Sequence, residues 1–528
     1  MLIKKIVIVG GGSAGWMTAA TLVKNFPHMD INVIESPNVP TVGVGESTLG
    51  QINEWLATLD IKDEDWMKEC DASYKLSIKF TDFYKKGAGA FHYPFGSPAW
   101  PQDAAPQGLQ DWYYKKILHP ETPVTDFVDT FWPIMALVNE NKITDQSIPE
   151  LDTYRFDWDA AYHFDATKFG IWLKEKYCQP KGVTLIKNDV KEIHTKNENI
   201  THLTLADDSI VEADLFIDCT GFRSILMNAI DAEFESWSDI LPNDSAWATR
   251  LPFTDKEKEL EPYTNCTAIG NGWVWNIPLW SRTGTGYVFS SQYISDEDAL
   301  EEFKNYLRNE REVKVSNELI DQLEFKKIKM RVGIQKEIFK GNVCAIGLSA
   351  GFIEPLESNG LYSVHEFLHH LVLTLSREDV NQFDRDAFND KCYGQFKAFA
   401  EFVALHYALS LRDDTPYWRD VRQRKMPKTM PAGLYSTTGI DNLMYRRMEA
   451  NHFEFEMGGI ICIATGMNYF PIDKALMTRY KHKYQYYDME NVLNKNFSIW
   501  QDIKNLRSNA VKDCPTLYKF LEERYKND

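Results

Sequence analysis

A glycine-rich turn close to the N-terminus constrains the fold more than any other feature of the chain. Residues 3–9 are rich in β-branched side chains, and the GxGxxG pattern runs directly after them from Gly10 to Gly15. Residues 14–26 then carry apolar side chains at helical spacing, and residues 31–34 have the composition of a second strand. This order predicts a βαβ unit in a doubly wound parallel sheet, and therefore an α/β fold.

An acidic residue at the end of the second predicted strand points to a dinucleotide ligand. Glu35 lies at the position where a carboxylate accepts hydrogen bonds from a ribose hydroxyl, roughly 20 residues after the turn. The pyrophosphate would rest on the helix N-terminus. The residues predicted to contact the cofactor here are Gly10, Gly12, Ser13, Ala14, Gly15 and Glu35. The motif alone is compatible with FAD and with NAD.

Two later segments are predicted to return to the same sheet. Residues 214–218 and 342–346 are β-rich and run into glycine-containing loops. We therefore expect a discontinuous FAD-binding domain over residues 1–400, with inserted substrate-side segments, and a mainly helical substrate-side subdomain over residues 401–528. A second GxGxxG is absent from the sequence, which favours one tightly held FAD over a separate nicotinamide domain.

Charge and cysteine spacing exclude several functional classes. The formal net charge of −18 disfavours nucleic acid and anionic lipid as partners. The eight cysteines include no CxxC pair and no Cys/His cluster at metal-ligand spacing, so we expect no metal site. No apolar stretch approaches the roughly 20 residues of a membrane helix. We expect a cytoplasmic protein without a membrane partner.

Four segments carry a resemblance to a known family. Residues 272–278, GWVWNIP, match the WxWxIP signature of flavin-dependent halogenases, and residues 43–47, GVGES, are similar to their second glycine motif. Residues 346–360, IGLSAGFIEPLESNG, resemble their flavin and halide loop, and residues 74–80, YKLSIKF, resemble the segment with their catalytic lysine. The chain therefore resembles the flavin-dependent halogenases of the tryptophan halogenase family.

This resemblance implies an FAD-binding fold of the flavoprotein hydroxylase type with an added, mainly helical substrate subdomain. It implies that reduced FAD, O₂ and a halide give hypohalous acid, which Lys75 directs at an aromatic ring while Glu357 handles the ring proton. Further cofactor contacts are implied for Gly45, Glu46, Gly347 and Leu348, and halide contacts for Asn359 and Gly360. The implied tunnel and substrate-pocket residues are Trp273, Trp275, Ile277, Pro278, Ser358, His92, Tyr93, Pro94 and Phe95.

Two departures from the tryptophan-specific pattern bear on specificity. Asn359 stands where relatives commonly have threonine, and Tyr93 stands where a histidine is expected. We therefore expect bromide or iodide to be preferred, and an electron-rich aromatic of the indole type rather than tryptophan alone. A separate NAD(P)H-dependent flavin reductase is the implied partner. The sequence does not determine the oligomeric state.

Simpler interpretations exist for the residues singled out. Trp273 and Trp275 have strand spacing and suit the core, Lys75 suits a solvated surface, and Glu357 suits the cap of a helix that begins near Asn359. Two rival functions share the dinucleotide motif. One is an FAD-dependent aromatic hydroxylase, or monooxygenase, and the other is a flavoprotein that uses FAD as a redox sensor or structural cofactor. The substrate of a hydroxylase must reach the flavin edge, which the WxWxIP segment would obstruct, and a redox sensor would have no need for Lys75 together with Glu357.

Overall fold

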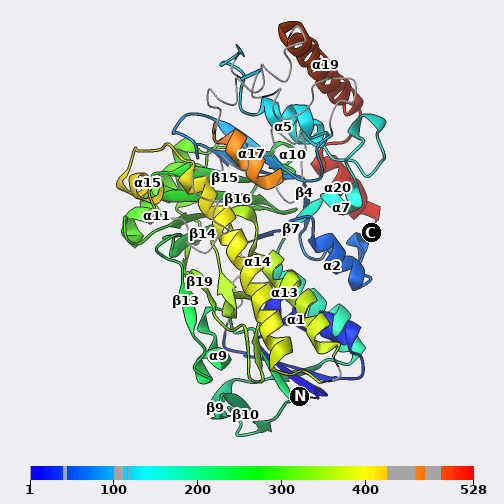
Figure 1. The fold of residues 1–528 in the computed structure, drawn as a ribbon, viewed down its shortest axis with the longest axis vertical. Helices are drawn as coiled ribbons and strands as arrows, with labels where there is room; N and C mark the ends of the chain where they lie inside the picture. The colour runs from blue at the N-terminus through cyan, green and yellow to red at the C-terminus, as the bar shows by residue number, and fades with distance from the viewer. Residues whose placement is uncertain are drawn as a thin grey trace.

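Two large sheets organise the chain, as seen in a computed structural model of residues 1–528 (Figure 1). The structure describes residues 2–39, 45–99, 112, 115–116, 118–377, 379–424, 458–469 and 489–527. The sheet that contains the N-terminal strand lies with α1 and α13 in the lower half of Figure 1, and the larger sheet lies above it.

The N-terminal sheet has six strands and is doubly wound. In spatial order they are β20 (Phe339–Lys340), β21 (Val343–Ala345), β12 (Leu215–Asp218), β1 (Lys5–Val9), β2 (Asp30–Glu35) and β8 (Thr184–Lys187). Neighbours are parallel except at the edge, where β20 is antiparallel to β21. From β1 the chain moves to β2 on one side and returns at β12 on the other, so ligands are expected at the carboxyl end of β1. The predicted α/β fold and the return of both later segments are confirmed.

Helix α1 (Ser13–Asn25) follows the glycine turn and lies against α13 (Gly360–Leu375). Its apolar side chains enter the main core, with Met17 and Leu22 fully buried. Gly10 has a φ of +119°, and a Cβ there would lie 2.2 Å from the carbonyl oxygen of Cys219. A Cβ on Gly15 would lie 1.9 Å from the carbonyl oxygen of Gly10. Strand, turn and helix therefore pack closely enough to require glycine at both positions.

The larger sheet has seven strands. In spatial order they are β18 (Lys326–Lys329), β14 (Ser245–Leu251), β17 (Thr283–Phe289), β16 (Gly272–Pro278), β15 (Tyr263–Ile269), β5 (Ser77–Thr81) and β6 (Ala90–Pro94). The β15–β5 pair is parallel and the other pairs are antiparallel. Every residue of β16 and β17 is buried, since the WxWxIP strand is central.

A small sheet connects the two large ones. It pairs β3 (Glu46–Ser47) and β4 (Ser73–Lys75) on either side of β7 (Ala161–Phe164). Only Leu76 separates β4 from β5, so the small sheet runs on into the larger one. Two further sheets contain β9 (Val190–Lys196), β10 (Asn199–Leu205) and β11 (Ile210–Val211), and β13 (Phe234–Ser236), β19 (Gly333–Gln335) and β22 (Gly351–Phe352).

Helices surround the sheets. The longest is α14 (Gln382–Ala408), which packs along α13. The others are α2 (Ile52–Thr58), α3 (Asp63–Trp66), α5 (Asp126–Phe131), α6 (Met135–Asn139), α7 (Phe156–Asp159), α8 (Ala166–Trp172), α9 (Ile225–Ala229), α10 (Lys256–Glu259), α11 (Asp296–Asn305), α12 (Asn317–Ile320), α15 (Pro416–Val421), α17 (Gly458–Gly466), α19 (Met489–Ala510) and α20 (Leu517–Asn527).

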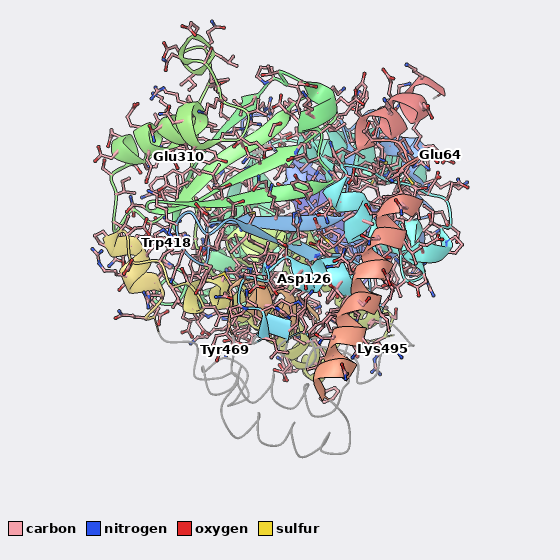
Figure 2. The ribbon with its side chains drawn as sticks, turned by 90° about the horizontal axis from the view of Figure 1, so that it is seen from above. Glu64, Asp126, Glu310, Trp418, Tyr469 and Lys495 are labelled. Carbon is pink, nitrogen blue, oxygen red and sulfur yellow. The ribbon has the colours of Figure 1, made fainter. Side chains whose placement is uncertain are left out.

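The C-terminal helices return to the body of the protein. Lys504 on α19 places its Nζ 2.6 Å from Oδ1 of Asp126 on α5. Figure 2, seen from above, labels Asp126 beside this long helix. Helix α20 packs beside β4, where the hydroxyl of Tyr525 donates to the carbonyl oxygen of Ala72 at 2.9 Å. The last segment of the chain therefore supports the strand that carries Lys75.

Residue 400 lies inside α14, and the proposed division there stays a prediction. The acidic segment 301–310 has the composition of a solvated helix, and it is helical, since α11 runs to Asn305 and continues directly as a π-helical turn. One face of this helix is not solvated, because Phe303 and Leu307 are fully buried in a second core cluster against the seven-stranded sheet.

None of the helices in the described ranges is both long and apolar enough to span a bilayer. Within the same residues, no three His, Cys, Asp or Glu side chains gather in a way that could hold a metal ion.

The packing of the glycine turn leads to a stability prediction. Gly15→Ala should destabilise the protein by at least about 2 kcal/mol, because the new methyl group would overlap the Gly10 carbonyl oxygen. The matched control is Gly394→Ala on the exposed side of α14, where a Cβ meets nothing within 4 Å. That change should stabilise by about 0.5–1 kcal/mol, since alanine is the better helix former. Chemical denaturation measures both, and equal effects would contradict the packing argument.

Candidate functional site

The first part of the site is the carboxyl edge of the six-stranded sheet. Gly12 is the N-cap of α1 and makes no side-chain capping bond, so the first-turn N–H groups of a 13-residue helix face this edge. Ser13 begins the helix, and its Oγ donates to the carbonyl oxygen of Ala166 at 2.8 Å. The arrangement fits the pyrophosphate of a dinucleotide.

Glu35 ends β2 beside this turn. Its Oε2 accepts from the indole N–H of Trp16 at 3.2 Å, and its Oε1 lies 3.3 Å from Nζ of Lys174. On the other side of β1, Gly347 has a φ of +72°, and a Cβ there would lie 2.7 Å from the Cβ of Ala14. Leu348 is 38% exposed at this edge. The predicted cofactor residues from the first and the later segments therefore meet along one sheet edge, and they fit FAD.

Lys75 ends β4 and is fully buried. Its Nζ donates to the carbonyl oxygen of Thr48 at 2.9 Å and to Oγ of Ser358 at 2.7 Å. The ammonium also lies 4.8 Å from the ring centroid of Phe95. Burial lowers the pKa of Lys75 to about 7, against the opposing effect of Cys266 and Glu357. The interpretation of Lys75 as a solvated surface lysine is therefore wrong.

A chain of buried hydrogen bonds continues from Lys75. Oγ of Ser358 lies 3.0 Å from Oγ of Ser47, which lies 2.7 Å from Oγ1 of Thr264. Oγ1 of Thr264 in turn lies 2.9 Å from Nε2 of His163. Burial and the nearby Lys75 lower the pKa of His163 well below its usual range. These hydrogen bonds connect β3, β4, β7, β15 and the loop before α13 to one another around Lys75.

Glu357 lies on the same loop and is also fully buried. Its Oε1 is 2.8 Å from Nε2 of His406 on α14. Burial raises the pKa of Glu357, while His406 and Lys75 lower it in part. Glu357 belongs to a short 3-10 turn that ends before Asn359, so it is a core residue rather than an exposed cap of α13.

The predicted halide residues begin α13. Asn359 is the N-cap and Gly360 the first residue of this 16-residue helix. A Cβ on Gly360 would lie 3.7 Å from Oε2 of Glu46. Burial, with Asp165 nearby, raises the pKa of Glu46 to about 7. Gly45 precedes it with a φ of +115°.

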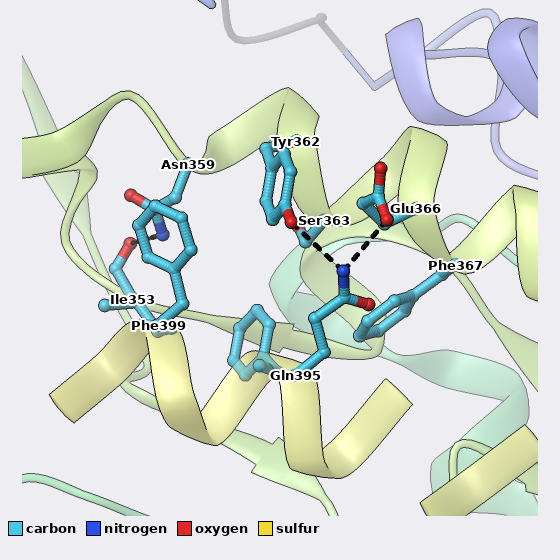
Figure 3. A pocket seen from close by; sticks show the side chains of 9 residues that line it. Ile353, Asn359, Tyr362, Ser363, Glu366, Phe367, Gln395 and Phe399 are labelled. Atoms are coloured by element: carbon cyan, nitrogen blue, oxygen red, sulfur yellow. Dashed lines mark hydrogen bonds between the residues drawn. The ribbon is translucent and has the colours of Figure 1, made fainter. Parts of the chain in front are cut away.

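A small pocket lies behind these residues, between α13 and α14 (Figure 3). Nε2 of Gln395 bridges its two sides, donating to the hydroxyl of Tyr362 at 3.0 Å and to Oε2 of Glu366 at 2.8 Å. Its lining residues are Ile353, Asn359, Tyr362, Ser363, Glu366, Phe367, Gln395, Phe396 and Phe399. Lys75 and Glu357 do not line it, so this pocket is separate from their site.

The two tryptophans of the WxWxIP strand lie on one face of β16. Their ring centroids are 6.3 Å apart, and both side chains are buried. The indole N–H of Trp273 donates to Oε2 of Glu354 at 2.8 Å, and the same oxygen accepts from Tyr407 at 2.6 Å and Asn243 at 2.8 Å. Ile277 and Pro278 complete the buried strand. Trp273 is therefore fixed by a buried carboxylate.

The residues of β6 divide between two faces. Tyr93 contacts Phe95 with ring centroids 6.2 Å apart, and a Cβ on Gly459 of α17 would lie 3.0 Å from the Tyr93 hydroxyl. The Lys75–Phe95 contact brings Phe95 to the lysine, and Tyr93 lies behind Phe95. Burial raises the pKa of Tyr93, which lies close enough to Glu357 that the charge of Glu357 raises this pKa further. His92 instead places Nδ1 3.0 Å from Oγ of Ser77 and its ring against Tyr263. Its neighbour Pro94 is buried at the end of the strand. The described contacts do not bring His92 to Lys75.

Sequence reasoning missed His406 and Glu354. The buried residues next to His406 in its helix are mostly apolar. A single histidine among core positions was therefore the only feature of the sequence that could have pointed to it. Glu354 stands three residues before Glu357 in the halide loop, but no local pattern separates an anchoring carboxylate from a reacting one. Residues 442–457, considered for substrate contacts, lie outside the described residues.

Comparisons with known proteins agree with this geometry. Residues 5–481 match the family model described as tryptophan halogenase. Tryptophan 6-halogenase SttH of Streptomyces toxytricini is 34% identical over 448 residues, covering 81% of this chain and 82% of that protein. Tryptophan 7-halogenase RebH of Lentzea aerocolonigenes is 31% identical over 548 residues, covering 99% of both.

A solved structure shares the whole architecture. The apo structure of VirX1 superimposes with a TM-score of 0.89 at 37% identity, and the match covers 99% of both chains. The same sheets and helices are therefore present in a protein of experimentally determined structure.

The buried state of Lys75 leads to a pH prediction. Its pKa falls from about 10.5 in the unfolded chain to about 7 in the folded one, so between these pH values the unfolded chain binds the extra proton. Wild-type stability therefore gains up to about 1.4 kcal/mol per pH unit as the pH rises through this window. Lys75→Met has no titrating group at this position, so its unfolding free energy lacks this increase with pH. The unfolding free energy of the wild type minus that of the variant should therefore increase from pH 7 to pH 10.

Denaturant titrations at several pH values measure this difference, in which the other titrating groups cancel. Lys79→Met, at a partly exposed position four residues along the chain, is the matched control for removing a lysine. A difference that stays constant over the whole range would show that Lys75 remains charged when buried.

Proposed function

This chain belongs to the tryptophan halogenase family, and from that premise we propose that it halogenates an electron-rich aromatic ring through Lys75. It is an enzyme, and its family is flavin-dependent, with FAD and a halide as its requirements. The single observation that carries the proposal is the 2.7 Å contact between Nζ of Lys75 and Oγ of Ser358. That contact joins the lysine strand to the loop at the cofactor edge.

The cofactor would be held along the sheet edge by the glycine turn, Glu35 and Gly347. Glu46 of β3, which lies next to the first residue of α13, would contribute as well. Bound reduced FAD would supply the two electrons with which O₂ and a halide ion give hypohalous acid. The N–H groups at the start of α13 would hold the halide, because Asn359 and Gly360 form the N-terminus of a long helix. Trp273 and Trp275 form a buried wall that would keep an aromatic substrate away from the flavin.

Lys75 is suited to handle hypohalous acid because both of its protonation states are accessible. With a pKa near 7, the ammonium can donate a hydrogen bond to the oxidant and the neutral amine can form a haloamine. Its present hydrogen bonds to Thr48 and Ser358 orient Nζ without water. A fully buried lysine lowers stability, and neither an aromatic hydroxylase nor a redox sensor needs one. We therefore prefer halogenation to both.

Glu357 is the proposed acceptor of the ring proton. The new carbon–halogen bond forms as the halogen leaves oxygen or nitrogen, and the C–H electrons return to the ring when the proton departs. Overall, hypohalous acid and the arene give the haloarene and water. Glu357 is close enough to Lys75 that the charge of each affects the pKa of the other. This proximity supports the proposal that Glu357 accepts the ring proton next to Lys75.

The substrate is proposed to be an indole-type aromatic. Phe95 presents its ring to Lys75 and Tyr93 packs on Phe95, whereas the named relatives above act on tryptophan. An aromatic pocket without matched polar partners for an amino acid backbone discriminates weakly, by about 1–3 kcal/mol per group. Tryptophan is therefore proposed as one accepted substrate among several indoles.

A separate NAD(P)H-dependent flavin reductase is the proposed partner, supplying reduced FAD by diffusion. All eight cysteines are free thiols in the structure, which suits a reducing compartment, and we propose that the enzyme works in the cytoplasm. Incubation with FAD, a reductase, bromide and indole tests the function directly. Mass spectrometry should show bromoindole as an isotope doublet. Hydroxyindole without bromoindole would favour the hydroxylase.

Lys75→Ala tests the role of the lysine. Bromoindole formation should fall by at least roughly 10², because the group that delivers the halogen is gone. FAD binding, followed by flavin fluorescence, and hydrogen peroxide release should persist, since Lys75 lies outside the cofactor edge. Lys79→Ala is the matched control and should retain product formation. Wild-type turnover by Lys75→Ala would remove Lys75 from the mechanism.

Halide and substrate preference form a separate prediction. In parallel reactions with equal chloride and bromide, brominated product should exceed chlorinated product, because bromide is easier to oxidise and Asn359 departs from the common threonine. Iodide should behave like bromide. Indole should compete with free tryptophan in the same vessel. Exclusive chlorination of tryptophan at one carbon would contradict both parts.

A further inference from the structure

His406 is a buried histidine next to Glu357, and the mechanism proposed above gives it no role. It lies in the last turn of α14 and is fully buried, with Nε2 2.8 Å from Oε1 of Glu357. Within the described part of the chain, neither Glu357 oxygen nor Nε2 of His406 has a hydrogen-bond partner, so this 2.8 Å ion-pair contact is the close polar contact of both groups. The inference below rests on the proposed function, because it concerns the proton that leaves the aromatic ring.

The other ring nitrogen determines where the histidine carries its hydrogen. Nδ1 of His406 lies 3.2 Å from the carbonyl oxygens of both Phe402 and Val403. A carbonyl oxygen only accepts, so Nδ1 must be the donor. In a neutral ring, Nε2 then carries no hydrogen. A bare nitrogen and a carboxylate oxygen at 2.8 Å would repel each other, so one of the two groups must carry a proton, and the pair shares it.

The surroundings make this shared proton necessary. The rings of Phe80, Phe83 and Phe402 lie around the imidazole, with centroids 4.8, 6.3 and 5.7 Å away. An isolated carboxylate is strongly disfavoured in such an apolar site. The titratable groups that face the pair are Glu354, Lys75, Tyr93, Cys266 and Cys462. Of these, only Lys75 can supply a positive charge.

We propose that His406 is the positioning residue that takes the shared proton from Glu357 while Glu357 takes the ring proton. The proton on Oε1 moves to Nε2 as Oε2 receives the proton from the ring carbon. The pair then carries one positive charge, which it loses when a proton passes to the hydroxide or amine left by halogen transfer. No proton or electron is left over, because the net products are the haloarene and water.

This relay requires that the group next to the Glu357 carboxyl can accept a proton. A group that only donates a hydrogen bond is not sufficient. Without His406, Glu357 remains a neutral acid whose hydroxyl hydrogen has no acceptor, and Oε2 is too weak a base for the ring proton. A side chain that merely fills the space or donates a hydrogen bond cannot replace the imidazole. That difference separates the relay from a structural role.

Two substitutions in the FAD-loaded full chain test the relay. His406→Gln keeps a hydrogen-bond donor of similar reach but cannot take up a proton, and His406→Phe removes both. Reactions use reductase, bromide, and either indole or ring-deuterated indole. We expect both variants to brominate roughly 10² more slowly, and the deuterated indole to react more slowly than the light one, because proton removal has become rate-limiting.

The pH profile provides a second measurement. His406 lowers the pKa of Glu357, so its removal should raise that pKa further and move the rising limb of the rate to higher pH in both variants. Tyr407→Phe is the matched control, because Tyr407 is the next residue of α14 but bonds Glu354 instead. It should show neither the isotope effect nor the shift. FAD binding and thermal midpoints identify variants that fail to fold.

The possible outcomes separate the relay from the proposed function. Restoration of the wild-type rate and pH profile by His406→Gln would overturn the relay, since glutamine supports structure but not proton uptake. Bromination by His406→Phe without an isotope effect would overturn it as well. Failure of the wild-type enzyme to form any bromoindole would instead reject the proposed function itself.

Discussion

A lysine ammonium without access to water is the constraint on which the rest of the site depends. Lys75 can be buried only because Thr48 and Ser358 accept its hydrogen bonds and Glu357 lies near it. Ser358 meets this requirement in a left-handed conformation, with φ of 59°, which a serine adopts at a cost. The backbone conformation of the loop before α13 therefore allows Ser358 to accept the hydrogen bond from Lys75. Ser47 and Thr264 hold that loop from the other side.

Two carboxylates of this loop have opposite environments. Glu354 accepts three hydrogen bonds on one oxygen, from Trp273, Tyr407 and Asn243, and so acts as an anchor. Glu357 makes a 2.8 Å contact with Nε2 of His406 instead. Burial raises the pKa of both carboxyl groups, and each has an oxygen without a hydrogen-bond partner among the described residues. What distinguishes Glu357 is that its charge acts on the pKa of Lys75. The contrast resembles other enzymes in which environment assigns different roles to paired acids.

Much of the fold could be predicted because its signals are local. The glycine turn, the helix after it and the later strands 214–218 and 342–346 follow from residue types and spacing over short windows, and the structure agrees. Residues 301–310 have the composition of a solvated helix and are helical, but packing decided that one face is buried, because Phe303 and Leu307 lie in a core that the acidic composition of the segment does not reveal. His406 was missed for the same reason. Its partner Glu357 belongs to a different element of the chain.

The sequence by itself determined the doubly wound topology and the family, since glycine positions, strand periodicity and the GWVWNIP segment are properties of consecutive residues. Only the tertiary structure decided which side chains act together. Lys75 and Lys79 look alike in sequence, and it is the junction of β4 with β7 and the halide loop that buries one and leaves the other partly exposed. Lys75 and Ser358 meet across 283 residues of chain, and a contact of that range exists only once both sheets have packed.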